Sequence, residues 1–237
     1  MAIIAPTKRR AFQTTRQNTP PLWKSYYHII YTITFCVLGI TLPLMHLKNV
    51  LFAELMIVPL TFVVANIVEY IIHRWPMHHK YPGAGKMIEL HMIHHDYFKE
   101  DTYRVDKFED FANIVFPPVV LNIVAFGIAP IFTFATWHLL GKNAAILFFS
   151  TVIAYYLLMQ IIHVLTHLDR DHWIVSIPGI KYLCVHHRVH HVRECMTKTN
   201  FNFILPLFDF AMGTCTQNQN LIKGNSENKE PIIIPLM

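Results

Sequence analysis

The feature that most restricts the fold of this chain is a series of four long apolar stretches, at residues 27–45, 51–72, 111–137 and 144–162. At about 1.5 Å of rise per residue, each stretch can cross a hydrocarbon layer of about 30 Å as an α-helix. A lone strand could not satisfy its backbone hydrogen bonds in lipid. Composition agrees, because 53% of the residues are hydrophobic and only 15% are charged, against about 25% charged in soluble domains. The sequence therefore predicts an all-α integral membrane protein with four transmembrane helices.

The basic residues are distributed unevenly along the chain. Of the Lys and Arg residues, five precede the first stretch, six lie in residues 74–107 and seven follow residue 169, against only Lys48 and Lys142 in the turns that join the stretches in pairs. By the positive-inside rule, we expect both termini and the segments 73–110 and 163–215 to be cytoplasmic. The cations accompany apolar stretches rather than forming a solvated stripe, which indicates a membrane surface and no nucleic-acid partner.

We expect three regions along the chain. They are a basic cytosolic segment at residues 1–26, a membrane domain at residues 27–215 and a tail at residues 216–237. The first apolar stretch is too long for the core of a signal peptide, so we expect it to be retained. Pro117, Pro118 and Pro130 predict a kink in the third helix. The expected location is a bacterial inner membrane or the endoplasmic reticulum membrane.

Ten histidines form four clusters at the cytoplasmic ends of the predicted spans or in cytoplasmic segments. They are His73 and His78; His91, His94 and His95; His163 and His167; and His187, His190 and His191. Side chains three or four residues apart lie on the same face of a helix, so three of the clusters can each converge on one point. His73 and His78 are five residues apart, but Pro76 lets the chain turn so that His78 swings back toward the site.

These histidines predict a metal site. Ten imidazoles exceed the roughly four to six ligands of one ion and suit two ions with about five each. Imidazole favours iron, zinc, copper or nickel over magnesium or calcium. The sequence therefore predicts a dimetal site, held in a cytosolic helical cap, with the ten histidines as ligands. His79 and His186 are alternatives if the register of a cluster is shifted.

The order and spacing of the clusters resemble those of the fatty acid hydroxylase and sterol desaturase superfamily. The similarity covers about residues 50–215 and includes EYIIHR at residues 69–74 and NFNFILPLFD at residues 200–209. The first cluster is HxxxxH, which is more similar to the fatty acid 2-hydroxylase branch than to sterol desaturases, which usually carry HxxxH. Many relatives have glycine where this chain has Asn202 and tryptophan where it has Phe208.

The resemblance implies a membrane-bound non-haem di-iron oxygenase that hydroxylates a lipid acyl chain with O2 and two electrons. Two iron ions would be the cofactor, and zinc can substitute for them in a produced sample. Because no fused cytochrome b5 domain is expected, the electrons would come from an external donor, such as cytochrome b5 or a ferredoxin with its reductase. The ring N–H groups of the ligands need acceptors, and Glu69, Asp209 and Asn200 are the candidates for residues that support the ligands.

Other functions use some of the same features. A desaturase or an oxidase of a sterol or other lipid, including a carotenoid hydroxylase, would need the same clusters. A metal transporter would also need nitrogen ligands, but its sites usually lie near the middle of the spans, where this chain is apolar. A bis-histidine haem cytochrome needs single facing histidines rather than triplets.

Overall fold

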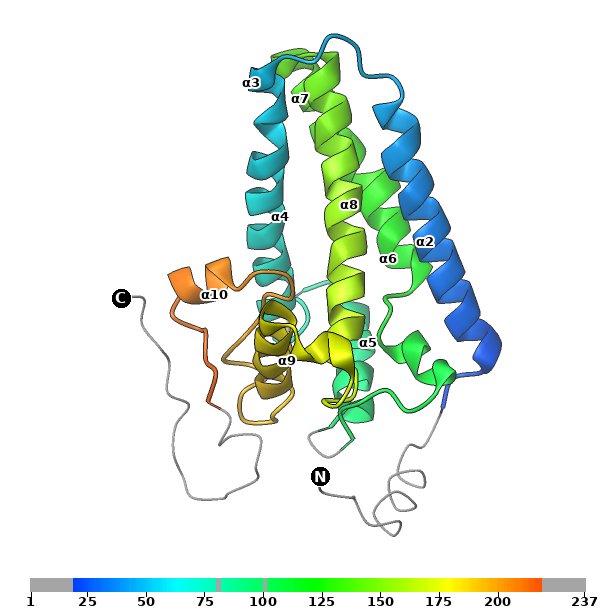
Figure 1. Cartoon of the computed structure of the whole chain (residues 1–237), viewed down its shortest axis with the longest axis vertical. Coiled ribbons are helices and arrows are strands. Elements are labelled where there is room, and N and C mark those ends of the chain that lie inside the picture. Colours follow the sequence, from blue (N-terminus) through cyan, green and yellow to red (C-terminus); the bar gives the residue numbers. More distant parts are fainter. Residues whose placement is uncertain (1–18, 80–81, 100–101, 219–237) are drawn as a thin grey trace.

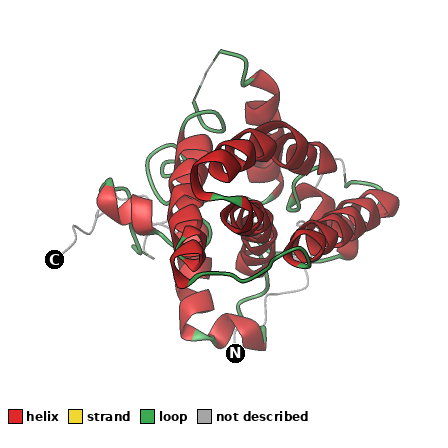
Figure 2. Cartoon of the chain, turned by 90° about the horizontal axis from the view of Figure 1, so that it is seen from above, coloured by secondary structure: helices red, strands yellow, loops and turns green. Residues whose placement is uncertain are grey.

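The computed structural model describes residues 19–79, 82–99 and 102–218, and every regular element in these residues is a helix (Figures 1 and 2). The longer helices are α2 (Leu22–Leu44), α4 (Ile57–Arg74), α5 (Gly85–Tyr97), α7 (Ala129–Leu140), α8 (Lys142–Thr166) and α9 (Pro178–His190). The shorter ones are α3 (Phe52–Leu55), η1 (Phe108–Asn113), α6 (Pro118–Asn122), η2 (Ile123–Ile128), η3 (Trp173–Ser176) and α10 (Leu207–Ala211).

Four helical stretches are long and apolar enough to cross a membrane. They are Leu22–Leu44, Phe52–Arg74, Pro118–Leu140 and Lys142–Thr166. Large aliphatic side chains such as Ile30, Leu60 and Ile131 are exposed on them, as is expected of helices whose outer faces contact lipid. The structure therefore confirms that the regular elements of the described residues are all helices, with four candidate membrane spans among them.

The third span shows how the chain accommodates its prolines. The predicted stretch began at residue 111, but the long helix begins only at Pro118, after the short 3-10 helix η1. Proline has no backbone N–H and is tolerated only in the first helical turn, so Pro117 and Pro118 delay the start. Before Pro130 the helix widens into the π-helical segment η2. In this segment the Ala129 N–H bonds to the Val124 carbonyl, five residues back. The wider turn lies next to the position where Pro130 has no N–H to donate.

Helix α8 is the centre of the bundle and contacts α2, α4 and α7. In Figure 1 it runs between α4 and α2. Its buried Ile153 and Tyr156 pack in one apolar cluster with Cys36 of α2 and with Leu121 and Ala125 of the third span. This cluster joins three of the four spans and so fixes the position of the fourth-span helix, which carries His163 and is followed directly by His167.

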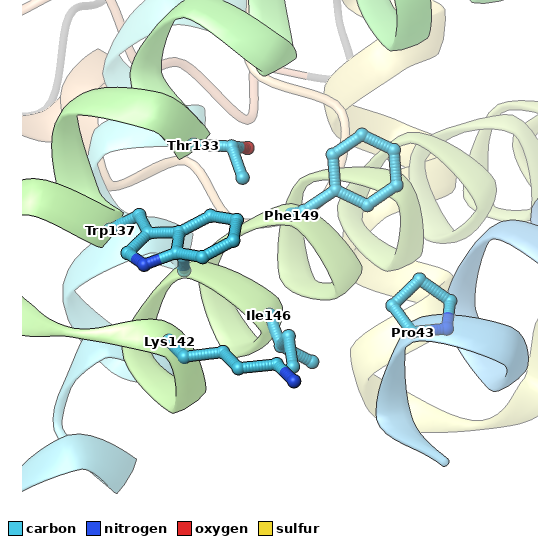
Figure 3. A pocket seen from close by; sticks show the side chains of 7 residues that line it. Pro43, Thr133, Trp137, Lys142, Ile146 and Phe149 are labelled. Atoms are coloured by element: carbon cyan, nitrogen blue, oxygen red, sulfur yellow. The ribbon is translucent and has the colours of Figure 1, made fainter. Parts of the chain in front are cut away.

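The two short turns between the spans meet at one end of the bundle (top of Figure 1). The Asn143 side chain accepts a hydrogen bond from the Lys48 N–H at 3.3 Å and donates to the Lys48 carbonyl at 2.8 Å and to the Glu54 carboxylate at 3.1 Å. A cavity of about 230 Å³ opens at the same end and is lined by Pro43, Thr133, Trp137, Lys142, Ala145, Ile146 and Phe149 (Figure 3). We call the opposite end, where α4 and α8 stop, the histidine end.

Gly141 connects α7 to α8 with φ 92° and ψ 176°, a conformation that is essentially restricted to glycine. We expect Gly141→Ala to lower the free energy of unfolding by about 1 to 3 kcal/mol, although the added Cβ would meet no atom within 4 Å. Gly179→Ala is the control, because a Cβ there also has open space and the position is helical, so it should be neutral or stabilising. Chemical unfolding in detergent measures both, and equal losses would contradict the assignment of strain.

Candidate metal centre

The ends of α4 and α8 and the helices α5 and α9 bring all ten predicted histidines together at the histidine end. The first histidine group consists of His73, His78, His91, His95 and His190, whose ligating nitrogens all lie within 4.8 Å of one another. The Nε2 atom of His78 lies 2.9 Å from that of His91, 3.0 Å from that of His190 and 3.3 Å from that of His73. Helix α4 ends at Arg74, so the chain turns before Pro76 and returns His78 to His73, as the sequence predicts.

The second histidine group lies beside the first. His94, His163, His167 and His187 place their ligating nitrogens within 4.8 Å of one another. His191 belongs with them, because its Nε2 atom is 3.1 Å from the Nε2 atoms of both His94 and His187. The rings of His191 and His95 stack with 4.1 Å between their centroids. The two groups are therefore adjacent, with five histidines in each.

The prediction that each triplet converges on one point was wrong, because each triplet is divided between the two groups. In α5, His91 and His95 are four residues apart and reach the first group, whereas His94 reaches the second. In α9, His190 reaches the first group and His187 the second. Positions three and four residues apart lie side by side on a helix but diverge by several tens of degrees. One helix face can thus line two neighbouring sites.

Backbone carbonyls fix which nitrogen of the ring carries the proton. The Nδ1 atoms of His73, His94, His167, His190 and His191 lie 2.5 to 2.9 Å from the carbonyl oxygens of Phe201, Asn113, Tyr103, Thr199 and Phe98. A carbonyl oxygen only accepts hydrogen bonds, so each Nδ1 must carry the proton and donate it. In a neutral ring the Nε2 atom is then unprotonated and carries a lone pair. The Nε2 atoms of His94 and His191 are two such lone pairs and lie only 3.1 Å apart, a separation that a shared cation would satisfy.

The rings are neutral at pH 7. Burial lowers the pKa of His94 and of His190 to about 4, and that of His78 to about 2. The Nδ1 atoms of His78, His91 and His95 are buried without a hydrogen-bond partner in the described part of the chain. Neutral imidazole is the form that binds metals. The donor set therefore fits metal ions, and nitrogen ligands favour a transition metal.

The segment 199–203 supports both groups. The Thr199 carbonyl accepts from the His190 ring and the Phe201 carbonyl from the His73 ring. The Phe203 ring stacks on the His73 ring with 4.7 Å between centroids and 9° between planes. It also lies 4.6 Å from the His163 ring. Phe203 thus covers one side of the centre across both groups.

Glu69 supports this segment rather than a histidine. Its carboxylate accepts hydrogen bonds from the Tyr155 hydroxyl at 2.7 Å, the Asn66 amide at 3.2 Å, the Asn202 amide at 3.0 Å and the Phe203 backbone N–H at 3.1 Å. These donors differ from the ligand N–H group that the sequence suggested. The carboxylate joins α4, α8 and the loop, and it therefore acts on the histidines through Phe203.

Asp209 supports the same segment from the other side. Its carboxylate accepts from the backbone N–H groups of Phe201 at 2.9 Å and Asn202 at 2.8 Å, and from the Thr214 hydroxyl at 2.7 Å. It also pairs with His186 Nε2 at 3.1 Å. Burial lowers the pKa of His186, but the hydrogen bonds to Asp209 and Cys215 outweigh it and raise that pKa to about 9. Asp209 thus holds the loop that supplies the Phe201 carbonyl.

Asn200 fixes the shape of the loop between its two accepting carbonyls. It has φ 61°, a left-handed conformation that asparagine adopts more readily than most residues. Its amide donates to the His186 and Thr216 carbonyls, and its oxygen accepts from the Thr216 N–H, all at 2.8 Å. Like Glu69 and Asp209, Asn200 therefore acts on the loop and has no direct bond to a ring of either group.

The two alternative histidines lie outside both groups. His79 is exposed to solvent or lipid, and its Nδ1 bonds to the Arg74 carbonyl at 2.6 Å. His186 is buried and directed at Asp209. Neither the accepting carbonyls nor Phe203 could be identified from the sequence. The family-like stretch at residues 200–209 indicated this part of the chain. Every residue has a backbone carbonyl, however, so the side-chain pattern does not show which carbonyls accept hydrogen bonds.

Four candidate membrane spans that hold two groups of buried, neutral histidines at one end define a membrane protein with sites suited to metal ions. The family model for fatty acid hydroxylases matches residues 58–214, which is more than half of the chain. The chain therefore belongs to the fatty acid hydroxylase family. No curated protein and no solved structure matches it. Family membership supports an oxidoreductase with a lipid hydroxylase or desaturase type of function.

Proposed function

We propose that the protein is a membrane-bound non-haem di-iron oxygenase that hydroxylates a lipid acyl chain in the manner of the fatty acid 2-hydroxylases. The observation that carries the proposal is the convergence of two five-histidine groups at one end of the candidate spans. In the reaction, one atom of O2 enters a C–H bond and the other leaves as water. Two electrons and two protons enter from outside the protein.

The chemistry of oxidation favours iron at these groups. Zinc also binds imidazole, but it has no redox chemistry. Five histidines in each group would hold one iron ion, and the two ions would supply O2 activation and removal of a hydrogen atom from the C–H bond. All ten ligands are neutral, and the buried carboxylates of Glu69 and Asp209 bond to the loop that covers them.

The lipid would reach the centre from the bilayer. Leu205, Leu207 and Met212, next to the loop that covers the histidines, are 43%, 47% and 50% exposed. An apolar surface at the end of the spans is stable where it rests on a membrane. We propose that the histidine end faces the cytoplasm, as the positive-inside rule indicates. A cytoplasmic donor, such as cytochrome b5 or a ferredoxin with its reductase, would then supply the electrons.

Desaturation of a sterol or another lipid is the second candidate, because membership of the family is compatible with a desaturase type of function as well. The same residues would hold the same ions, and a second hydrogen would be removed where hydroxylation adds oxygen. The two products differ in mass, so one experiment distinguishes them. Transport of metal is a weaker candidate, because the two histidine groups lie at the ends of α4 and α8 rather than near the middle of the spans.

The test compares the lipids of cells that express the wild type, His94→Ala or His46→Ala, together with a matched reductase. His94 belongs to the second histidine group, whereas His46 is exposed in a turn at the opposite end. We expect a lipid class that gains one oxygen with the wild type and with His46→Ala, and not with His94→Ala. A lipid that loses two hydrogens in the same pattern would show a desaturase. If the lipids of wild-type and His94→Ala cells are identical, the proposed oxygenase is wrong.

A further inference from the structure

A separate cavity of about 280 Å³ lies at the histidine end, between the end of α8, η3 and α9. We call it the basic cavity. Its polar lining consists of Tyr103, Thr166, Arg170, Ser176, Lys181 and Arg188, with Cys184. These residues belong to neither histidine group. In Figure 1, α9 lies next to the lower end of α8, where this cavity is formed.

Positive charge dominates the basic cavity. Arg170, Lys181 and Arg188 are cations, and none of the lining residues is acidic. The Arg188 guanidinium carbon lies 5.1 Å from the centroid of the Tyr103 ring, within the range of a cation–π contact. A small space with three cations and no carboxylate in its lining attracts an anion.

A buried hydroxyl lies in the wall of the basic cavity. The Tyr103 side chain is only 3% exposed, and its hydroxyl makes no hydrogen bond of ordinary length among the described residues, although the Thr166 hydroxyl, which donates to the His163 carbonyl, lies near it. An unsatisfied buried hydroxyl costs about 1 to 3 kcal/mol. An oxygen of a bound anion would accept its proton. The hydroxyl is thus a second observation, independent of the charges, that points to a ligand.

The level of the basic cavity relative to the membrane indicates the source of the anion. Thr166 is the last residue of α8, and so it marks the end of a membrane-length helix. Trp173 and Ile177, on either side of the lining residues Val175 and Ser176, are 70% and 46% exposed. Exposed tryptophan next to basic residues is typical of the interface between hydrocarbon and water. The cavity therefore lies at the level of lipid headgroups.

We propose that the basic cavity binds the anionic headgroup, a phosphate or a carboxylate, of a membrane lipid. Arg170, Lys181 and Arg188 provide the charge, and Tyr103 donates a hydrogen bond. The Tyr103 ring lies 4.4 Å from the His167 ring. A headgroup bound here is thus separated from the second histidine group by one aromatic side chain. The proposal concerns binding, and it stands or falls independently of the oxidation reaction.

Binding is measured on the full-length, metal-loaded protein in detergent, by native mass spectrometry and by the midpoint of thermal unfolding. The probes are dioleoyl phosphatidic acid, oleate, dioleoyl phosphatidylcholine and inorganic phosphate. The test variant is Arg170→Gln with Lys181→Gln, two exposed positions. The matched control is Arg193→Gln with Lys198→Gln, which are also exposed and do not line the cavity. Tyr103→Phe keeps the ring and removes only the hydroxyl.

We expect phosphatidic acid or oleate to bind the wild type at least about tenfold more tightly than phosphatidylcholine does. The Arg170 and Lys181 variant should lose about tenfold in that affinity, Tyr103→Phe should also weaken it, and the matched control should keep it. Equal binding of the anionic lipids to the test and control variants would overturn the proposal. So would equal stabilisation by inorganic phosphate and phosphatidic acid, which would show a site for a free anion.

Discussion

Removal of the bound metal is expected to lower the midpoint of thermal unfolding by about 15 to 30 °C. An ion present at a thousandfold excess over its dissociation constant stabilises the folded state by about 4 kcal/mol, and two ions by about 8 kcal/mol. In a chain of this size, 1 kcal/mol corresponds to about 2 to 4 °C. Without ions, Nε2 atoms of each histidine group lie only about 3 Å apart in a buried site.

The measurement is thermal unfolding in detergent, followed by tryptophan fluorescence, before and after a chelator. The control is the double variant His94→Ala and His190→Ala, which lacks one ligand in each group and should respond little to the chelator. Ferrous iron added back without oxygen should restore the midpoint of the wild type only. If the chelator removes the metal and the wild-type midpoint does not move, the histidine groups are not held together by metal ions.

The approach of the ten histidines could be predicted because it follows from side-chain spacing, but the division of each triplet between the two histidine groups could not. His91, His94 and His95 follow the period of a helix, and this period alone predicts that they share a face. The long apolar stretches likewise require spanning helices. Both features are local in sequence, so the candidate spans and the approach of the ten histidines follow from the sequence without knowledge of any tertiary contact.

The surroundings of the histidines could not be predicted in the same way. Glu69 lies four residues before His73, which suggested a contact within one helix. In the structure its carboxylate turns to the Phe203 N–H, 134 positions along the chain, and to Tyr155 of another span. Such contacts depend on how helices and loops pack. The carbonyls of Thr199 and Phe201 are a second case, since every residue has a carbonyl and only the backbone path directs it.

The predicted start of the third span was wrong for a local reason. Residues 111–117 are apolar enough to continue a span, and the hydrophobic pattern does not separate them from the helix that follows. Pro117 and Pro118 decide the boundary, because the helix can start only where a missing N–H costs nothing. A proline pair inside an apolar stretch is therefore better interpreted as the start of a helix than as a kink in it.

Asp209→Asn is expected to lower the free energy of unfolding by about 3 to 5 kcal/mol. The carboxylate is 0% exposed and accepts hydrogen bonds from Phe201, Asn202, Thr214 and His186. An asparagine amide would place its own donors against some of these donors and leave the His186 ring without a counter-charge. The loop that presents the Phe201 carbonyl would loosen, so metal affinity should fall by about 10- to 100-fold.

Asp171→Asn is the control, because Asp171 is an exposed carboxylate at the histidine end, and its effect should stay within about 0.5 kcal/mol. Chemical unfolding measures the free energy of each variant. The single variants Asp209→Asn and His186→Gln, their double variant and the wild type form a thermodynamic cycle. The double variant should lose less than the sum of the single losses, because it leaves no buried charge unpaired. Additive losses would show that the two residues do not act as a pair.

The pair also predicts a pH dependence. In the folded protein the Asp209 hydrogen bond raises the pKa of His186, against the effect of burial, from 6.5 to about 9. The stability that the protonated ring contributes is therefore complete below pH 6.5 and is lost as the pH rises through about 9. Wild-type stability should decline over this range, and Asp209→Asn should lack that part of the decline. A parallel decline in both proteins would assign it to other groups.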